Sequence, residues 1–269
     1  LSFILEKNII LVTIVLIYNN WILMENEYLY ILALVMILAG FVQGSIGFGF
    51  PLVSTAFLTL FTDIQTAIFF TLIPSLLLNI VSIKSEGNFF EAIKKYYPFA
   101  LFSMIGCTLS TLILLNYETP IFKLLLAFII LVYLFFNQFN VQLSFIPKYP
   151  QFSKIFFGTS TGIIGGLTNV MAPLFLIYSL ESKHTKAQTI QAGNVCFLFA
   201  KFIQVFLFLI NDKFVDIEVG FSFFVLFGVT CAFYIGIQLR KRMNINLYKK
   251  VINVLLLLIS LNILMQNLI

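Results

Sequence analysis

The sequence predicts an all-α polytopic membrane protein, and two features support this class. Of the 269 residues, 61% are hydrophobic and 10% are charged, whereas soluble domains are about half apolar and about a quarter charged. Apolar runs long enough to cross roughly 30 Å of hydrocarbon recur from one end of the chain to the other. Each run is expected to be a helix, because lipid offers no partner to unpaired backbone groups.

Reading for apolar length gives candidate spans throughout the chain. They are 8–24, 28–60, 64–83, 97–116, 120–140, 155–180, 188–210, 217–238 and 247–268. The first resembles a signal anchor in position, but no small-residue cleavage site follows it. We therefore expect residues 1–27 to hold one extra N-terminal transmembrane helix.

Two of these segments contain too many glycines and prolines for one straight helix. Both residue types break or kink helices. Segment 28–60 contains Gly40, Gly44, Gly47, Gly49 and Pro51, and segment 155–180 contains Gly158, Gly162, Gly165, Gly166 and Pro173. Each segment is predicted to be either a helical hairpin or a re-entrant loop that returns to the side on which it started.

The Lys and Arg residues between the spans indicate how the chain crosses the membrane. If every segment crosses once from a cytoplasmic N-terminus, nine of them fall inside and six outside. If the two broken segments are hairpins, only Lys123 and Lys213 remain outside, which is a proper positive-inside pattern. The inside set then comprises Lys7, Lys84, Lys94, Lys95, Lys148, Lys154, Lys183, Lys186, Arg240, Lys241, Arg242, Lys249 and Lys250.

With hairpins, the chain divides into two halves of opposite orientation. Residues 28–140 form a hairpin plus three helices that begin outside, and residues 155–269 form the same set beginning inside, with 141–154 as the linker. A faint internal repeat agrees, since three glycines of the first half recur at an offset of 118. The pairs are Gly40/Gly158, Gly44/Gly162 and Gly47/Gly165, and Pro51 then pairs with Pro173 after a four-residue insertion.

Inverted repeats with interrupted helices are typical of secondary transporters, whose substrates bind near the midplane at the breaks. Glycine lets a substrate approach the backbone, and N–H groups at a helix start suit an anion. At the breaks we expect Gln43, Ser45, Gly47, Gly49, Gly165, Gly166, Thr168 and Asn169 to line such a site. Gly40, Gly44, Gly158 and Gly162 fit close helix packing better.

The helix after each hairpin carries a polar stripe. In the first half, Thr71, Ser75, Asn79 and Ser82 fall within an arc of roughly 80°. In the second half, Gln191, Asn194 and Lys201 fall within a similar arc. We expect Ser75, Asn79, Gln191, Asn194 and Lys201 to contact substrate. Hydroxyls such as those of Thr71 and Ser82 serve equally well to hold helices together in lipid.

Lys201 is the most informative single residue. It lies about 20 Å along the span 188–210, and a lysine inside the membrane is a candidate functional residue by default. Two alternatives remain open: its long side chain could reach the outer interface, or it could hold two helices together through carbonyl groups. We favour binding or compensation of a substrate anion.

Several function classes find no support in the sequence. All eleven Asp and Glu residues lie at or near span ends, so no carboxylate is placed to carry protons or bind a cation in mid-membrane. Cys107, Cys196 and Cys231 are isolated, which argues against a disulfide frame or a zinc site. His184 is expected to be solvated in an inner loop. No catalytic motif is present, so we expect no enzyme and no cofactor, and the loop charges report topology rather than nucleic-acid binding.

The residues also resemble a known family. The run Ala39-Gly40-Phe41-Val42-Gln43-Gly44-Ser45-Ile46-Gly47-Phe48-Gly49-Phe50-Pro51-Leu52-Val53 is similar to the opening motif of the TauE/SafE sulfite-exporter family. The run from Gly162 to Pro173 and the pattern Asn194 to Lys201 resemble its second half more loosely. The resemblance covers nearly the whole chain after residue 28. It implies a bacterial inner-membrane permease for sulfite, sulfonates or related sulfur-containing organic anions, often working outward.

The sequence thus predicts a small-anion permease with a midplane site where the two hairpins meet, working by alternating access in the lipid bilayer with the N-terminus cytoplasmic. Asn169-Val170-Met171-Ala172 stands where the family has more glycine, and the gap from Asn194 to Lys201 is longer, so the anion could differ. Two rivals remain open, an anion channel of the same fold and a non-transporting scaffold subunit. The direction, the coupling ion and the oligomeric state, a homo-oligomer included, also remain open.

Overall fold

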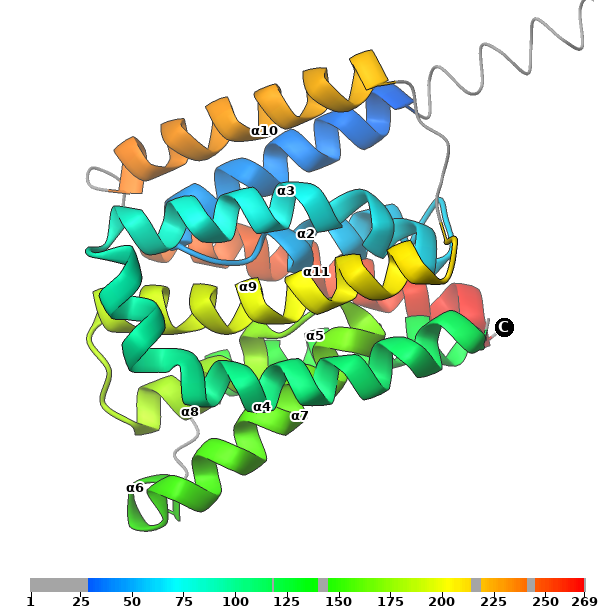
Figure 1. Cartoon of the computed structure of the whole chain (residues 1–269). Coiled ribbons are helices and arrows are strands. Elements are labelled where there is room, and N and C mark those ends of the chain that lie inside the picture. Colours follow the sequence, from blue (N-terminus) through cyan, green and yellow to red (C-terminus); the bar gives the residue numbers. More distant parts are fainter. Residues whose placement is uncertain (1–28, 118, 140–144, 214–218, 241–244, 269) are drawn as a thin grey trace, which may run out of the picture.

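The computed structural model describes residues 29–117, 119–139, 145–213, 219–240 and 245–268, and within these ranges the secondary structure is entirely helical (Figure 1). The expected N-terminal span 8–24 lies outside the described residues. The helix Leu29–Ile46 comes first. It is followed by α2 (Phe50–Leu58), α3 (Ile64–Ser85), α4 (Phe89–Asn116), α5 (Ile121–Phe139), α6 (Phe145–Lys148), α7 (Pro150–Thr168), α8 (Ala172–Glu181), α9 (Lys186–Ile210), α10 (Val219–Arg240) and α11 (Ile245–Leu268).

The composition of these helices confirms a polytopic membrane protein. Five of the described helices are long and apolar enough to cross a membrane: Leu29–Ile46, α3, α4, α9 and α10. Shorter apolar helical stretches lie in α5 and α11. Large apolar side chains such as Phe223, Phe227 and Leu258 are exposed on their outer faces, as expected where the surroundings are lipid.

Both segments rich in glycine and proline are broken helices. The helix Leu29–Ile46 stops before Gly47, and α2 starts at Phe50. Likewise α7 stops at Thr168, and α8 starts at Ala172. In each case the next long helix, α3 or α9, starts at the end of the bundle where the broken segment began (Figure 1). The element order after each break is also the same, a short helix followed by three longer ones.

The centre of the bundle is formed by α3 and α9, which pack against each other in opposite directions. The Ile83 carbonyl near the end of α3 accepts a hydrogen bond from Gln191 near the start of α9. Thr71 near the start of α3 shares a partner, Asn169, with Lys201 near the end of α9. Around this pair, α4 packs against α7 and α9, and α5 lies beside α11.

Glycines bring α4 and α7 close enough for their backbones to touch. A Cβ atom added at Gly162 would lie 1.9 Å from the Ser103 carbonyl oxygen, and one added at Gly106 would lie 2.2 Å from that of Thr159. No side chain fits at either position without moving a helix backbone. The packing role expected for Gly162 therefore agrees with its surroundings.

A second glycine contact joins the helix Leu29–Ile46 to α10. A Cβ added at Gly44 would lie 2.1 Å from the Phe233 carbonyl oxygen, and one added at Gly236 would lie 2.5 Å from that of Phe41. This interface matches the α4–α7 interface residue by residue. Gly44 and Phe41 of the first helix correspond to Gly162 and Thr159 of α7, an offset of 118, and Phe233 and Gly236 of α10 correspond to Ser103 and Gly106 of α4, an offset of 130. The glycine contacts of the helix Leu29–Ile46 with α10 thus correspond one to one with those of α7 with α4.

The halves differ by about one helical turn before the break. The first helix ends two residues after Gly44, whereas α7 ends six residues after Gly162, and four residues make about one turn. The extra turn carries Gly165 and Gly166, which therefore lie inside α7 rather than in the break. Between α3 and α9 the offset between equivalent positions is 122, as the N-cap residues Asp63 of α3 and Thr185 of α9 illustrate.

Most of the positive charge gathers at one end of the bundle, called here the basic end. It contains the α3–α4 and α8–α9 connections, the start of α7 and the end of α10 (Figure 1). The Lys and Arg residues there include Lys84, Lys94, Lys95, Lys148, Lys154, Lys183, Lys186 and Arg240. Lys123 and Lys213 lie at the opposite end.

The sequence suggested that His184 at the basic end is simply solvated, but the structure shows it in contact with other residues. Its Nδ1 lies 3.1 Å from Ser179 Oγ, and its ring contacts Tyr96 and Tyr178 edge-on. Burial of the ring, and secondarily the charge of Lys95, lower the pKa of this histidine. It therefore helps to close the connection between α8 and α9.

Candidate functional site

The two breaks are built from residues that tolerate a left-handed backbone. Gly47 and Gly49 have φ angles of 101° and 116°, and Asn169 has a φ of 67°. Glycine adopts such angles without a steric penalty, and asparagine is among the side chains that tolerate them best. Pro51 then sits in the first turn of α2, where its missing N–H would have no helical partner anyway.

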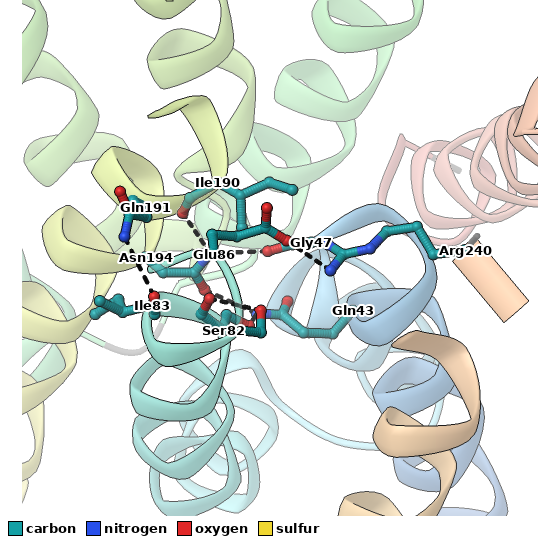
Figure 2. A network of polar contacts seen from close by, with 10 residues as sticks. Gln43, Gly47, Ser82, Ile83, Glu86, Ile190, Gln191, Asn194 and Arg240 are labelled. Carbon is teal, nitrogen blue, oxygen red and sulfur yellow. Dashed lines mark hydrogen bonds and ion pairs between the residues drawn. The ribbon is translucent and has the colours of Figure 1, made fainter. Parts of the chain in front are cut away.

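The first break is held by a set of polar residues, the Gln43 network, comprising Gln43, Gly47, Ser82 and Asn194 (Figure 2). Gln43 Oε1 accepts from the Phe50 N–H at the start of α2, and its Nε2 donates to Asn194 Oδ1 at 3.0 Å and to Ser82 Oγ at 3.4 Å. Asn194 Nδ2 donates to the Gly47 carbonyl oxygen at 2.8 Å. One glutamine thus ties the broken helix to both α3 and α9.

Contacts continue from this network toward the basic end (Figure 2). Gln191 Nε2 donates to the Ile83 carbonyl oxygen at 3.4 Å. Beyond it, Arg240 at the end of α10 pairs with Glu86 after α3, with an N–O distance of 2.6 Å. These contacts connect helices of the two halves and close the basic end over the Gln43 network.

The second break is held by the Lys201 network, comprising Thr55, Thr71, Asn169, Lys201 and Gln204. Asn169 Nδ2 donates to the hydroxyl oxygens of Thr55 and Thr71. Lys201 Nζ donates to Asn169 Oδ1 and to Gln204 Oε1. This network joins α2, α3 and α9 to the end of α7, so the second break contacts three helices at once.

The charge of Lys201 is enclosed in the protein. Its side chain is only 1% exposed, and both oxygens that accept its protons belong to neutral amides. Within the described ranges, no Asp or Glu is among the buried side chains. A buried charge without a counter-charge is expensive, so this arrangement favours the approach of an anion.

The two breaks face each other across a very small cavity. It is lined by Gly49, Pro51 and Leu52 from the first break, by 169–172 from the second, and by Phe197 and Lys201 from α9. Its volume is about 10 Å³, which is at most the space of a single water molecule. At Gly49 an added Cβ would meet only Val42, at 3.6 Å. The space between the two breaks is therefore almost completely filled by protein atoms.

Two buried polar groups lie on the face of α3 that links the two networks. Ser75 and Asn79 are 1% and 2% exposed, and among the described residues neither Ser75 Oγ nor Asn79 Nδ2 has a hydrogen-bond partner. They share the helical arc of Thr71, in the Lys201 network, and Ser82, in the Gln43 network. Unpartnered buried polar groups need an explanation such as a bound ion or ligand, so this face is a candidate substrate surface.

The structure separates the sequence candidates into different groups. It brings Gln43, Gly47, Ser75, Asn79, Asn194 and Lys201 onto the networks or the α3 face between them, and Gly49 and Asn169 onto the small cavity. Thr168 caps the end of α7 by donating to the Ile164 carbonyl and accepting from the Val170 N–H. Gln191 lies nearer the basic end than the breaks.

Three expected site residues take part in packing contacts. Ser45 donates to the Phe41 carbonyl of its own helix, and its backbone lies against Gly236 of α10. Gly165 packs on the side chain of Met171, which lies in the second break and lines the small cavity. Gly166 packs against α4, where a Cβ would lie 1.9 Å from Ser110 Oγ. These glycines permit close packing, and Asn169 rather than a glycine makes the second turn.

Thr55 and Gln204 were not identified from the sequence. The available signal for Gln204 was its position three residues after Lys201, which places both on one face of a helix. Thr55 offered only its position four residues after Pro51 in a short apolar helix.

A much larger cavity, of about 470 Å³, lies elsewhere between the helix Leu29–Ile46, α3, α9 and α10. Its lining is almost wholly apolar and includes Met36, Phe69, Phe208 and Phe223. It contains no buried cation or amide, so its size does not make it the candidate site for a polar substrate.

Comparison with protein families gives a match over most of the chain. The model of the family described as sulfite exporter TauE/SafE matches residues 32–263. Comparisons with curated proteins and with solved structures gave no match. The matched range includes both breaks and both polar networks.

Proposed function

This chain belongs to the sulfite exporter TauE/SafE family, and on that premise we propose that it is a permease for small sulfur-containing anions. The proposed substrates are sulfite, sulfonates and related organic anions, and the proposed mechanism is alternating access at the site between the two breaks. The proposed setting is a bacterial inner membrane, with the basic end in the cytoplasm according to the positive-inside rule.

The observation that carries this proposal is the enclosed charge of Lys201. Two neutral amide oxygens hold its ammonium group, and Asn169 couples it to the second break. A lysine that reached the interface would not be 1% exposed. An amide-held lysine in surroundings without buried carboxylates supports an anionic substrate rather than a cation.

The proposed binding groups come from both halves of the chain. Lys201 supplies charge, while Asn79 and Ser75 supply hydrogen bonds from α3. The anion can approach the backbone closely around Gly49 and Asn169, which line the small cavity. Gln43 and Asn194 hold the first break in place, and a movement of that break would change the access to the site.

We further propose that the halves 28–140 and 155–269 are inverted repeats. Support comes from the antiparallel packing of α3 and α9, the equal element order and the matched glycine interfaces. Repeats of this kind let one half rock against the other around a fixed site. The proposed repeats leave out residues 1–27, where the sequence predicts one extra helix, and the linker 141–154.

The closed state of the site favours a permease over a channel. The cavity between the breaks holds at most one water, and contacts such as Glu86–Arg240 close the basic end. A substrate reaches Lys201 only if these contacts open. Flux should therefore saturate with anion concentration, whereas flux through a channel would rise linearly.

The test is anion transport by the purified protein in lipid vesicles, with sulfite, sulfate, thiosulfate, sulfoacetate, taurine and lactate as candidate substrates. Lys201→Ala should abolish transport of the accepted anion, because the site loses its charge. Lys186→Ala is the matched control, since it makes the same change on the same helix at an exposed position. A non-transporting scaffold would move no anion in the wild type, and full transport by Lys201→Ala would remove Lys201 from the site.

A further inference from the structure

The charge of the candidate site can be counted from the described residues. Lys201 is the one Lys, Arg, Asp or Glu among the buried side chains of the described ranges. Its partners Asn169 and Gln204 are neutral, as are Thr55 and Thr71 beyond them. The described site therefore carries one positive charge and no negative one.

One further titratable group faces this part of α9. Cys107 of α4 has its Sγ 3.6 Å from the Ala200 carbonyl oxygen and 3.7 Å from Thr111 Oγ1. A thiol in apolar surroundings is neutral at neutral pH. It therefore leaves the count at one positive charge.

The repeat-equivalent position adds hydrogen bonding without charge. Equivalent positions of α3 and α9 differ by 122, as their N-cap residues Asp63 and Thr185 do, and this pairs Asn79 of α3 with Lys201 of α9. Asn79 Nδ2 is buried and has no hydrogen-bond partner in the part of the chain that the structure describes. One half of the molecule thus offers an ammonium group, and the other offers a neutral amide donor at the matching place.

From this asymmetry, and resting on the proposed function, we propose that the site selects substrates of one net negative charge. A monoanion neutralises Lys201. A dianion leaves one negative charge unpaired in the interior, and a zwitterion brings its own positive charge next to the ammonium group. Both outcomes leave an uncompensated buried charge, which is strongly penalised.

Three sulfonates of nearly equal size provide the test. Isethionate carries one negative charge and sulfoacetate carries two. Taurine is a zwitterion with no net charge. In vesicles containing the wild-type protein, isethionate should bind and be transported at least about tenfold better than either of the others. Equal transport of isethionate and sulfoacetate would overturn the charge selection while leaving the permease function intact. Failure of all three, with sulfite also failing, would instead count against the proposed function.

A substitution at the equivalent position makes the test sharper. Asn79→Lys adds a second positive charge and should shift the preference by about tenfold or more toward sulfoacetate. Asn79→Gln is the matched control and should keep the preference for isethionate. If Asn79→Lys does not fold, the wild-type series still decides the question. Cys107→Ser should also keep the preference, and a changed preference there would show that the thiol contributes charge.

Discussion

At the scale of single residues, Asn169 combines a backbone role with a side-chain role. Its φ of 67° ends α7 and turns the chain toward α8. Its side chain accepts from Lys201 and donates to Thr55 and Thr71. Glycine would satisfy the backbone alone, and most other side chains would satisfy neither requirement. This explains why an asparagine stands where a glycine was expected.

This double role leads to a prediction for Asn169→Asp. Aspartate has the same shape and also tolerates a left-handed backbone, but it places a formal negative charge beside Lys201. The paired lysine should then attract anions less, and transport in vesicles should fall by about tenfold or more. Thermal stability should be equal or higher, since the buried charge gains a partner.

Asn88→Asp is a suitable control for that experiment. Asn88 caps α4 at the basic end, and aspartate is as good an N-cap as asparagine. This variant should transport at the wild-type rate. If Asn169→Asp also did so, the charge of Lys201 would have no part in holding the anion.

Residues that are expensive to bury could be predicted from the sequence, and cheaper ones could not. Lys201 and Asn194 stood out because charge and amide groups inside a span need a reason. Thr55 did not, because a hydroxyl can bond to its own helix and is common in spans. Ser45 was selected for its proximity to the break, and in the structure its hydroxyl donates to the Phe41 carbonyl of its own helix. It lies two positions from Gln43, which sets the two side chains about 200° apart around the helix.

At the scale of elements, the broken segments could be predicted but the exact break in the second one could not. Gly165 and Gly166 resemble Gly47 and Gly49 in sequence, yet they lie within α7. A glycine needed for close helix packing cannot be distinguished, from the sequence alone, from a glycine needed for a turn. Only the neighbouring helix distinguishes them, and α4 comes within reach of Gly166 through tertiary packing.

The glycine interfaces predict a clear difference between two alanine substitutions. In Gly162→Ala the new Cβ would lie 1.9 Å from a backbone oxygen of α4, so a helix must move. We expect a loss of roughly 3 kcal/mol, or about 6–12 °C in the thermal midpoint for a protein of this size. In Gly228→Ala the Cβ meets the Ile37 side chain, Cδ1 at 2.9 Å and Cγ1 at 3.0 Å, and no backbone atom of the described residues within 4 Å. That flexible group can rotate away, so the loss should stay within about 1 kcal/mol.

Thermal unfolding of the two variants in the same detergent measures this difference. Equal midpoints for both would mean that α4 and α7 do not approach as closely as described. Gly44→Ala, at the equivalent interface with α10, should behave like Gly162→Ala, because its Cβ would lie 2.1 Å from the Phe233 carbonyl oxygen.

At the scale of the whole molecule, two independent patterns support the proposed transmembrane arrangement. The charges between helices gather at the basic end, where the sequence placed the cytoplasm. The glycine contacts relate the halves without reference to charge. The distribution of Lys and Arg affects how the chain inserts into the membrane, whereas the glycine contacts affect how the inserted helices pack. Because the two patterns act at different steps, their agreement supports the same arrangement of the two halves.

The arrangement predicts which loops are accessible from each side of the membrane. Single cysteines at Phe61, Lys84, Lys186 and Lys213, all exposed, are introduced after replacement of the native Cys107, Cys196 and Cys231. If the broken segments are hairpins, an impermeant maleimide applied to intact cells should label positions 61 and 213. Positions 84 and 186 should react only after permeabilisation, because they lie at the basic end. If each segment crossed once, 61 and 84 would exchange sides, while 186 and 213 would keep theirs and serve as internal controls. Labelling of 84 from outside would therefore reject the hairpins, and with them the inverted relation of the halves on which alternating access depends.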